Sequence, residues 1–139
     1  MSKLAFAEAN VGDTLPALTL PALDRGTLAL FAGASGDHMN LHIDTDAARK
    51  AGMPDVFGHG MLSMAYLGRL VTRWVPQASL RSFDARFVGI THLGNVVTCT
   101  GKIVEKLERG GEKLVRVEIQ AATQYGDLKT AGEAVIALA

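Results

Sequence analysis

An acidic side chain and an imidazole stand five residues apart in a polar loop, at Asp37 and His42. A loop of this length can fold back so that the carboxylate and the ring contact one water molecule, and such a pair can move protons. A structural role suits the same two residues. Asp37 would then accept hydrogen bonds from backbone N–H groups in the turn after Gly36, and His42 would be a packed histidine. On spacing alone, the structural role is the commoner one.

A metal site is a second reading of the loop, because His38 and His42 have the four-residue spacing of two ligands on one helical face. However, Gly36 is expected to end the preceding helix, and no Glu follows His38 to act as a base. Only His59, His92 or a carboxylate could complete the ligand shell. The sequence therefore favours no metal at this loop.

The segment Gly58-His59-Gly60 leads directly into a long apolar stretch. Glycines let ligand atoms approach the backbone without meeting a Cβ, and the first turn of a helix leaves unpaired N–H groups at its N-terminus. This arrangement suits an oxyanion site with the Gly60 N–H as a donor. The alternative is a tight turn that needs positive φ, with His59 in a structural role.

Other reactive side chains have less support from their surroundings. Ser63 has no visible acid–base relay, and GMLSM is not a nucleophile elbow. Cys99 lies in an alternating segment and is expected to be a buried small hydrophobe. No glycine-rich phosphate loop follows a strand, so the sequence indicates no nucleotide and no other cofactor.

The elements that must position these residues follow from local patterns. A short edge strand is expected within residues 14–20, and a helix over 27–34 with Asp24 as a possible cap and Gly36 as its stop. Asp44 begins a helical turn that continues through Lys50. Residues 60–74 are apolar on nearly every face until Arg69, which predicts a central helix enclosed by protein. Four β-rich segments follow, at residues 79–88, 95–107, 113–125 and 129–138, with hairpin turns at 110–111 and 126–127.

Length and composition limit the possible functions. The 139 residues, 48% of them apolar, predict one α+β domain over 1–139, with an antiparallel sheet wrapped around the helix. Fourteen basic and fourteen acidic residues give zero net charge, which disfavours nucleic acid and membrane surfaces as partners. Glu8 interrupts the segment where a secretory signal would need apolar residues, and no run of 18 apolar residues exists. A cytoplasmic protein that pairs with a second copy is expected.

Three segments resemble the signature of the MaoC-like dehydratase family, which includes the R-specific enoyl-CoA hydratases. They are FAGASGD at residues 31–37, His42, and GHGML at residues 58–62. The likeness runs from about residue 24 to the end of the chain, and it implies a hot dog fold and a homodimer. It also implies that Asp37 and His42 are the catalytic pair and that the Gly60 N–H polarises a thioester carbonyl.

The resemblance thus implies a hydro-lyase that hydrates 2-enoyl thioesters to (R)-3-hydroxyacyl thioesters, carried by coenzyme A or acyl carrier protein. Asn40, His59, Met61 and Tyr66 are expected to line the substrate site. Met39 stands where the family usually has Asn, and Gly68 aligns with a frequent Ser. Two alternatives remain: a hot dog acyl-thioesterase, and a non-catalytic partner subunit of a heteromeric dehydratase.

Overall fold

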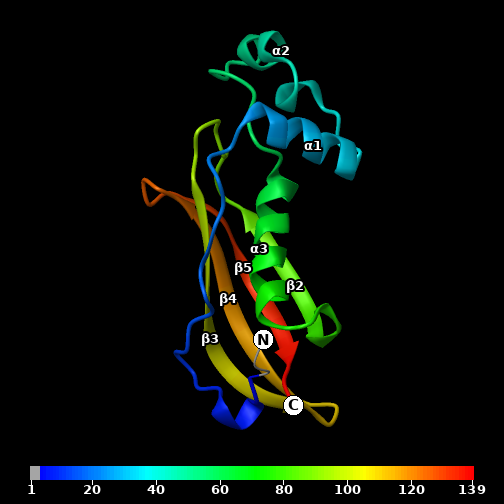
Figure 1. Ribbon diagram of the computed structural model, residues 1–139, viewed down its shortest axis with the longest axis vertical. Coiled ribbons are helices and arrows are strands. Elements are labelled where there is room, and N and C mark those ends of the chain that lie inside the picture. The colour runs from blue at the N-terminus through cyan, green and yellow to red at the C-terminus, as the bar shows by residue number, and fades with distance from the viewer. Residues whose placement is uncertain (1–3) are drawn as a thin grey trace.

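A five-stranded antiparallel sheet and one long helix packed on it form the body of the fold (Figure 1). The computed structural model describes residues 4–139. Residues 1–3, which belong to the N-terminal segment expected to lack a secretory signal, lie outside the described residues. The order of strands across the sheet is β1-β3-β4-β5-β2, and the expected α+β architecture is confirmed. The strands are β1 (Leu18–Thr19), β2 (Leu80–Phe87), β3 (Val97–Arg109), β4 (Glu112–Thr123) and β5 (Leu128–Ala137).

Tight turns join the three long central strands. Gly110 and Gly111 connect β3 to β4 with φ angles of 59° and 78°, a left-handed conformation that glycine adopts without strain. Gly126 has a φ of 83° in the turn between β4 and β5. Both predicted hairpins are therefore present. Along β4, Val115, Val117 and Ile119 are buried, so this strand turns one apolar face toward the core.

The central helix α3 spans Gly60–Trp74, the range predicted from the sequence. One of its faces is buried on the sheet, whereas Met61 on the opposite side is 54% exposed. Complete enclosure, as predicted from the apolar pattern, is wrong for the single chain, because one curved sheet covers only one side of a helix. Figure 1 shows α3 lying along one face of the sheet with its other side uncovered.

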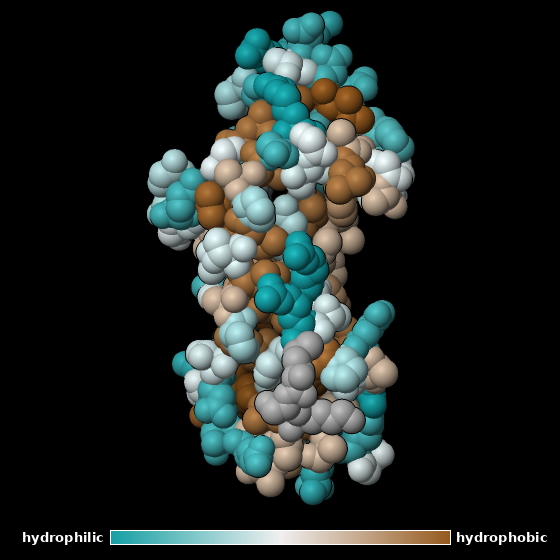
Figure 2. Space-filling view, in the orientation of Figure 1, coloured by the Kyte–Doolittle hydropathy of each residue, from teal (hydrophilic) through white to brown (hydrophobic). Residues whose placement is uncertain are grey.

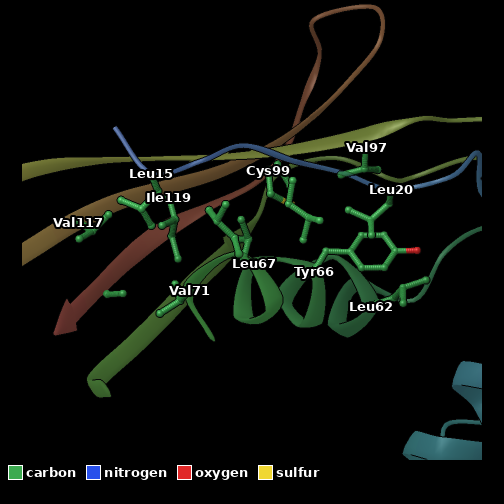
Figure 3. Packing of buried hydrophobic residues seen from close by; sticks show 14 of the residues in the cluster. Leu15, Leu20, Leu62, Tyr66, Leu67, Val71, Val97, Cys99, Val117 and Ile119 are labelled. Atoms are coloured by element: carbon green, nitrogen blue, oxygen red, sulfur yellow. The ribbon is translucent and has the colours of Figure 1, made fainter. Parts of the chain in front are cut away.

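Side chains from α3 and the sheet interlock in the core (Figure 3). Leu67 and Val71 of the helix are fully buried against sheet residues that include Cys99 and Val117. Glycine allows one especially close approach of two strands: a Cβ on Gly132 of β5 would lie 1.9 Å from the backbone oxygen of Asp84 in β2. The pairing of β2 with β5 thus depends on the absence of a side chain at Gly132.

Short helices gather beyond the N-terminal end of α3 (Figure 1). They are α1 (Arg25–Ser35), the 3-10 turn η2 (Asn40–His42) and α2 (Thr45–Lys50). Two further 3-10 turns, η1 (Phe6–Glu8) and η3 (Gln77–Ser79), lie elsewhere in the chain. Asp24 caps α1 by accepting a hydrogen bond from the Thr27 N–H, and Gly36 ends the helix with a φ of 77°, both as predicted. We call residues 24–57 the overhang.

An ion pair closes the overhang on itself. Arg25 contacts the carboxylate of Asp55 at 2.5 Å, and the Thr45 hydroxyl donates to the same carboxylate at 2.8 Å. These contacts link the start of α1, the start of α2 and the segment that leads to α3. They hold the intervening loop, which contains Asp37 and His42, in one arrangement.

The surface of the overhang is mixed in character. In Figure 2 apolar side chains gather over the α1 end of the molecule, beside hydrophilic ones. Leu30, Met39 and Ile43 are exposed to 75%, 56% and 49%. Within residues 4–139, no helix is both long enough and apolar enough to cross a membrane.

Candidate active site

Asp37 is placed by the end of α1. The left-handed backbone at Gly36 turns the chain away from the helix, and the Asp37 N–H donates to the Ser35 hydroxyl at 3.2 Å. One carboxylate oxygen of Asp37 accepts a hydrogen bond from the Met39 N–H at 3.3 Å. The structural role considered for Asp37 is thus realised, and its exposed side chain retains further acceptor capacity for a water molecule.

His42 ends the η2 turn and is 8% exposed. Its Nδ1 lies 2.7 Å from the backbone carbonyl oxygen of Phe57, which can only accept, so Nδ1 carries the proton. A neutral His42 therefore has its lone pair on Nε2. The Phe57 ring packs edge-on against the imidazole, with 5.0 Å between centroids. The ring is thus fixed in both orientation and tautomer.

His59 lies beneath His42 and is 1% exposed. The two imidazole rings stack with centroids 4.0 Å apart and planes inclined by 27°. Nε2 of His59 donates to the backbone carbonyl of Asp37 at 3.1 Å. Burial lowers the pKa of His59, while the hydrogen bond to Asp37 opposes this shift. At this depth the side chain lies behind the His42 ring.

The loop and the start of α3 bring these three side chains together. One carboxylate oxygen of Asp37 and one ring nitrogen each of His42 and His59 all lie within 4.8 Å of one another. A water molecule that makes two hydrogen bonds of about 2.8 Å at a tetrahedral angle spans about 4.6 Å. A separation of at most 4.8 Å therefore places Asp37 and His42 close enough to contact a single shared water.

The same three residues are the kinds of side chain that bind metals, but their geometry suits an ion poorly. A metal about 2.0–2.1 Å from an imidazole nitrogen lies near the plane of that ring. Stacked rings such as those of His42 and His59 direct their lone pairs along nearly parallel planes, not toward one point. His38 is exposed and its Nδ1 lies 3.2 Å from the Gly36 carbonyl, outside this cluster.

Gly60 is the first residue of α3. The preceding residue, His59, occupies the N-cap position and makes no side-chain hydrogen bond to the helix terminus, so the first N–H groups are not capped by it. Neither Gly58 nor Gly60 has positive φ, so the tight-turn interpretation of this segment is wrong. A Cβ on Gly60 would lie 3.4 Å from the Phe87 ring, and one on Gly58 would lie 3.3 Å from the Thr91 carbonyl oxygen. Close packing explains Gly58, whereas a methyl group on Gly60 would make only an ordinary van der Waals contact.

The remaining residues expected at the substrate site have different surroundings. Asn40 is exposed and begins η2, and its carbonyl accepts from the N–H groups of Ile43 and Asp44. Met61 is exposed beside Gly60, on the uncovered face of α3. Tyr66 is 8% exposed within the core, where Figure 3 shows its ring beside Leu20 and Leu62. Burial raises the pKa of Tyr66.

Two supporting contacts were not expected from the sequence. The Phe57 carbonyl orients His42, and the Thr91 carbonyl accepts the Gly58 N–H at 2.7 Å. Thr91 also places its hydroxyl 3.3 Å from that of Ser63, in the buried interior. A backbone carbonyl is present at every residue, so no sequence pattern marks the ones that act as acceptors.

Several known proteins are similar to this chain. A family model described as "MaoC like domain" matches residues 8–124. The unliganded R-hydratase PhaJ1 from Pseudomonas aeruginosa superposes with a TM-score of 0.86 at 27% identity, covering 98% of this chain and 86% of that one. The ChsH1-ChsH2 complex from Mycobacterium tuberculosis shares the fold, with a TM-score of 0.80 at 23% identity over 94% of this chain and 98% of that one.

One curated relative extends the comparison to a much larger protein. The fatty acid synthase beta subunit TOXC from Cochliobolus carbonum is 34% identical over 112 residues, which is 76% of this chain. The chain spans about 5% of the length of that relative. The family model covers most of the chain, and the hot dog fold of the R-hydratase matches nearly all of it. The chain therefore belongs to the MaoC-like dehydratase family.

Proposed function

We propose that the protein catalyses the reversible hydration of 2-enoyl thioesters to (R)-3-hydroxyacyl thioesters. The observation that carries this proposal is the approach of the Asp37 carboxylate and a His42 ring nitrogen to within 4.8 Å, beside the N-terminus of α3. An acid–base pair that shares one water is what addition of water to a double bond requires. The R configuration is included because the PhaJ1 relative is named an R-hydratase.

The reaction needs stabilisation of a negative charge on the substrate. Conjugation with the thioester carbonyl makes Cβ of the substrate electrophilic, and charge develops on the carbonyl oxygen as water adds. The Gly60 N–H at the start of α3 is the proposed donor to that oxygen. A single preorganised donor of this kind typically contributes about 3–4 kcal/mol to the transition state.

The Asp37–His42 pair supplies the proton transfers. The water oxygen bonds to Cβ, the electron pair of the double bond moves toward Cα and the carbonyl, and the water proton passes to the pair. The pair then returns a proton to Cα, on the same face. Because the two groups share the water, they act as one coupled acid–base unit. In the reverse direction the same steps eliminate water.

The proposed substrate is an acyl thioester of coenzyme A or acyl carrier protein. The likeness to part of a fatty acid synthase subunit is consistent with a dehydration step in fatty acid metabolism. A cytoplasmic location is part of the proposal, since such thioesters are intracellular metabolites.

We also propose that the working unit is a homodimer. Strand β2 lies at one edge of the sheet, and within the described chain its outer edge has no partner strand. The apolar residues at its end are well exposed, with Phe87 at 50% and Val88 at 53%. A second copy that pairs along this edge would cover both features.

Activity on a series of 2-enoyl-CoA substrates of increasing chain length tests the proposal. Hydration removes the ultraviolet absorbance of the conjugated enoyl thioester without releasing free thiol, and chiral analysis should give the R product. Release of thiol with the enoyl group intact would instead identify a thioesterase. If the dimer, purified alone, binds enoyl-CoA without turning it over, the protein is a partner subunit of a heteromeric enzyme. The ChsH1-ChsH2 complex, which shares the fold, contains two different proteins.

A further inference from the structure

His59 contacts both members of the Asp37–His42 pair from below. Its Nε2–H donates a hydrogen bond to the Asp37 backbone carbonyl at 3.1 Å, and its ring stacks on the His42 ring with a centroid distance of 4.0 Å. On another side, the Phe31 ring packs edge-on at 4.9 Å. At 1% exposure, His59 is among the most deeply buried polar side chains of the described residues.

We propose that His59 is a positioning residue that stays neutral and sets the separation between Asp37 and His42 without contacting the substrate. This inference rests on the proposed hydratase function. It assigns His59 a role different from that of a substrate-binding residue.

The hydrogen bonds fix the protonation state of His59. Nε2 must carry a proton, because its partner is a carbonyl oxygen that can only accept. Within residues 4–139, the buried Nδ1 has no hydrogen-bond partner. A second proton there would place an unpaired charge in the interior, which is costly. The ring is therefore held as the neutral Nε2–H tautomer.

Neutrality of His59 matters for the ring stacked above it. The charged or titratable groups that act on His59 are Asp37 and His42. When His42 accepts a proton from water it becomes a cation, and a second cation stacked 4.0 Å away would oppose that transfer. A neutral His59 leaves His42 free to hold the proton.

His59 also connects the acid–base pair to the proposed oxyanion donor. It is the N-cap residue of α3 and directly precedes Gly60. The side chain of His59 thus contacts Asp37 by a hydrogen bond and His42 by ring stacking, and its backbone is joined to Gly60 by the peptide bond. Displacement of His59 would change all three relationships together, and displacements of about 1 Å can lower a rate about 100-fold.

Two substitutions separate the contacts of His59. His59→Gln keeps an N–H donor for the Asp37 carbonyl but removes the ring, whereas His59→Phe keeps a ring under His42 but removes the donor. With crotonyl-CoA, we expect kcat to fall about 100-fold in His59→Phe and less in His59→Gln, with KM within about threefold of the wild-type value. The shape of the pH profile of kcat should be unchanged in His59→Gln.

Three results would overturn the proposal. An increase in KM at unchanged kcat would make His59 a substrate-binding residue. Loss of one limb of the pH profile in His59→Gln would make it a proton donor or acceptor. Wild-type kinetics in both variants would remove any role. Ser63→Ala is the matched control, because Ser63 is also buried in the first turn of α3 but its hydroxyl bonds to Thr91, and we expect its kcat to be unchanged.

A measurement on the wild-type protein tests the same proposal if the variants do not fold. Nitrogen-15 spectra of the four histidines should show His59 as an Nε2–H tautomer whose shifts stay constant from about pH 5.5 to 8, spanning the ordinary histidine pKa near 6.5. Titration of His59 within this range would contradict the proposal. The spectra do not depend on turnover. If the wild-type protein hydrates no enoyl-CoA, the proposed function is refuted, but the protonation state of His59 can still be measured.

Discussion

Nδ1 of His42 donates a hydrogen bond to the backbone carbonyl oxygen of Phe57 at 2.7 Å. Phe57 lies two residues before His59, so the segment that enters α3 holds the imidazole that ends η2. The bond leaves Nε2 as the nitrogen that can take or return a proton. Because the acceptor is a main-chain atom, this hydrogen bond does not depend on the type of side chain at position 57.

Replacement of either member of the acid–base pair should abolish hydration. Asp37→Asn and His42→Ala each remove a group that moves a proton, so we expect the rate with crotonyl-CoA to fall about 100-fold or more. Loss of ultraviolet absorbance measures the rate, and circular dichroism checks the fold. His38→Ala and Asp46→Asn are matched controls, because both residues are exposed and neither belongs to the cluster of Asp37, His42 and His59. Full activity in either pair variant would refute the assignment.

Gly60→Ala should lower activity more than stability. The added methyl group would lie 3.4 Å from the Phe87 ring, an ordinary contact with a half-exposed side chain, so the fold should be retained. The methyl group would also crowd the helix terminus where the thioester oxygen is expected to bind. We expect kcat/KM to fall at least about tenfold, as for a weakened oxyanion contact.

Gly68→Ala, on the same helix, is the control for Gly60→Ala. No heavy atom lies within 4 Å of its added Cβ, so alanine should raise the free energy of unfolding by up to about 1 kcal/mol. Enoyl-CoA turnover and thermal denaturation measure the two effects. Equal activity in both variants would argue against the Gly60 N–H as a donor.

Gly132→Ala should destabilise the sheet. Its Cβ would fall 1.9 Å from the backbone oxygen of Asp84, so β2 must move away from β5. We expect the free energy of unfolding to fall by about 3 kcal/mol, the cost of severe overpacking, measured by urea denaturation. Gly33→Ala in α1 has open space around the new methyl group and should not destabilise. Unchanged stability of Gly132→Ala would show that the two strands are further apart.

Acid should loosen the overhang. The hydrogen bond from Arg25 holds the pKa of Asp55 well below its ordinary value. A carboxyl group whose pKa is lowered by folding stabilises the fold above its ordinary pKa of about 3.9, and this stabilisation is lost as the pH falls toward the folded-state value. The protection factors of the α2 amides against hydrogen exchange should therefore fall below about pH 4. In Asp55→Asn the protection factors should be lower at neutral pH and less dependent on acid; an unchanged pH dependence would contradict the proposed link.

The thiol of Cys99 should be unreactive in the folded protein. Burial raises its pKa to about 12, so almost none of it is thiolate at pH 8. Iodoacetamide should modify Cys99 only as fast as the protein unfolds, and urea should accelerate the reaction. Rapid alkylation under native conditions would show that the core around β3 opens readily.

The sequence predicted those features that depend on local patterns. The bounds of α3 agree because an apolar run begins at a glycine and stops before Pro76. The β3–β4 hairpin agrees because Gly110-Gly111 supplies two positive φ angles. Asp37 and His42 could be proposed as a pair because both residues lie within one short loop. The uncovered face of α3 could not be foreseen, since apolar residues there resemble those of a buried helix. The burial of His59 was equally hidden, because it depends on packing between α1, η2 and α3.

The two hydrogen bonds made by the rings of His42 and His59 lie within one uninterrupted stretch of 24 residues, from Asp37 to Gly60. The long strands of the sheet pack against α3, but neither Asp37 nor His42 lies on a strand. Substitutions in the β3–β4 hairpin can therefore accumulate without disturbing proton transfer, as long as the sheet still folds. Transplanting that single stretch onto another sheet of the same curvature would carry both members of the pair, but it would also need partners that replace Arg25, Ser35 and Thr91.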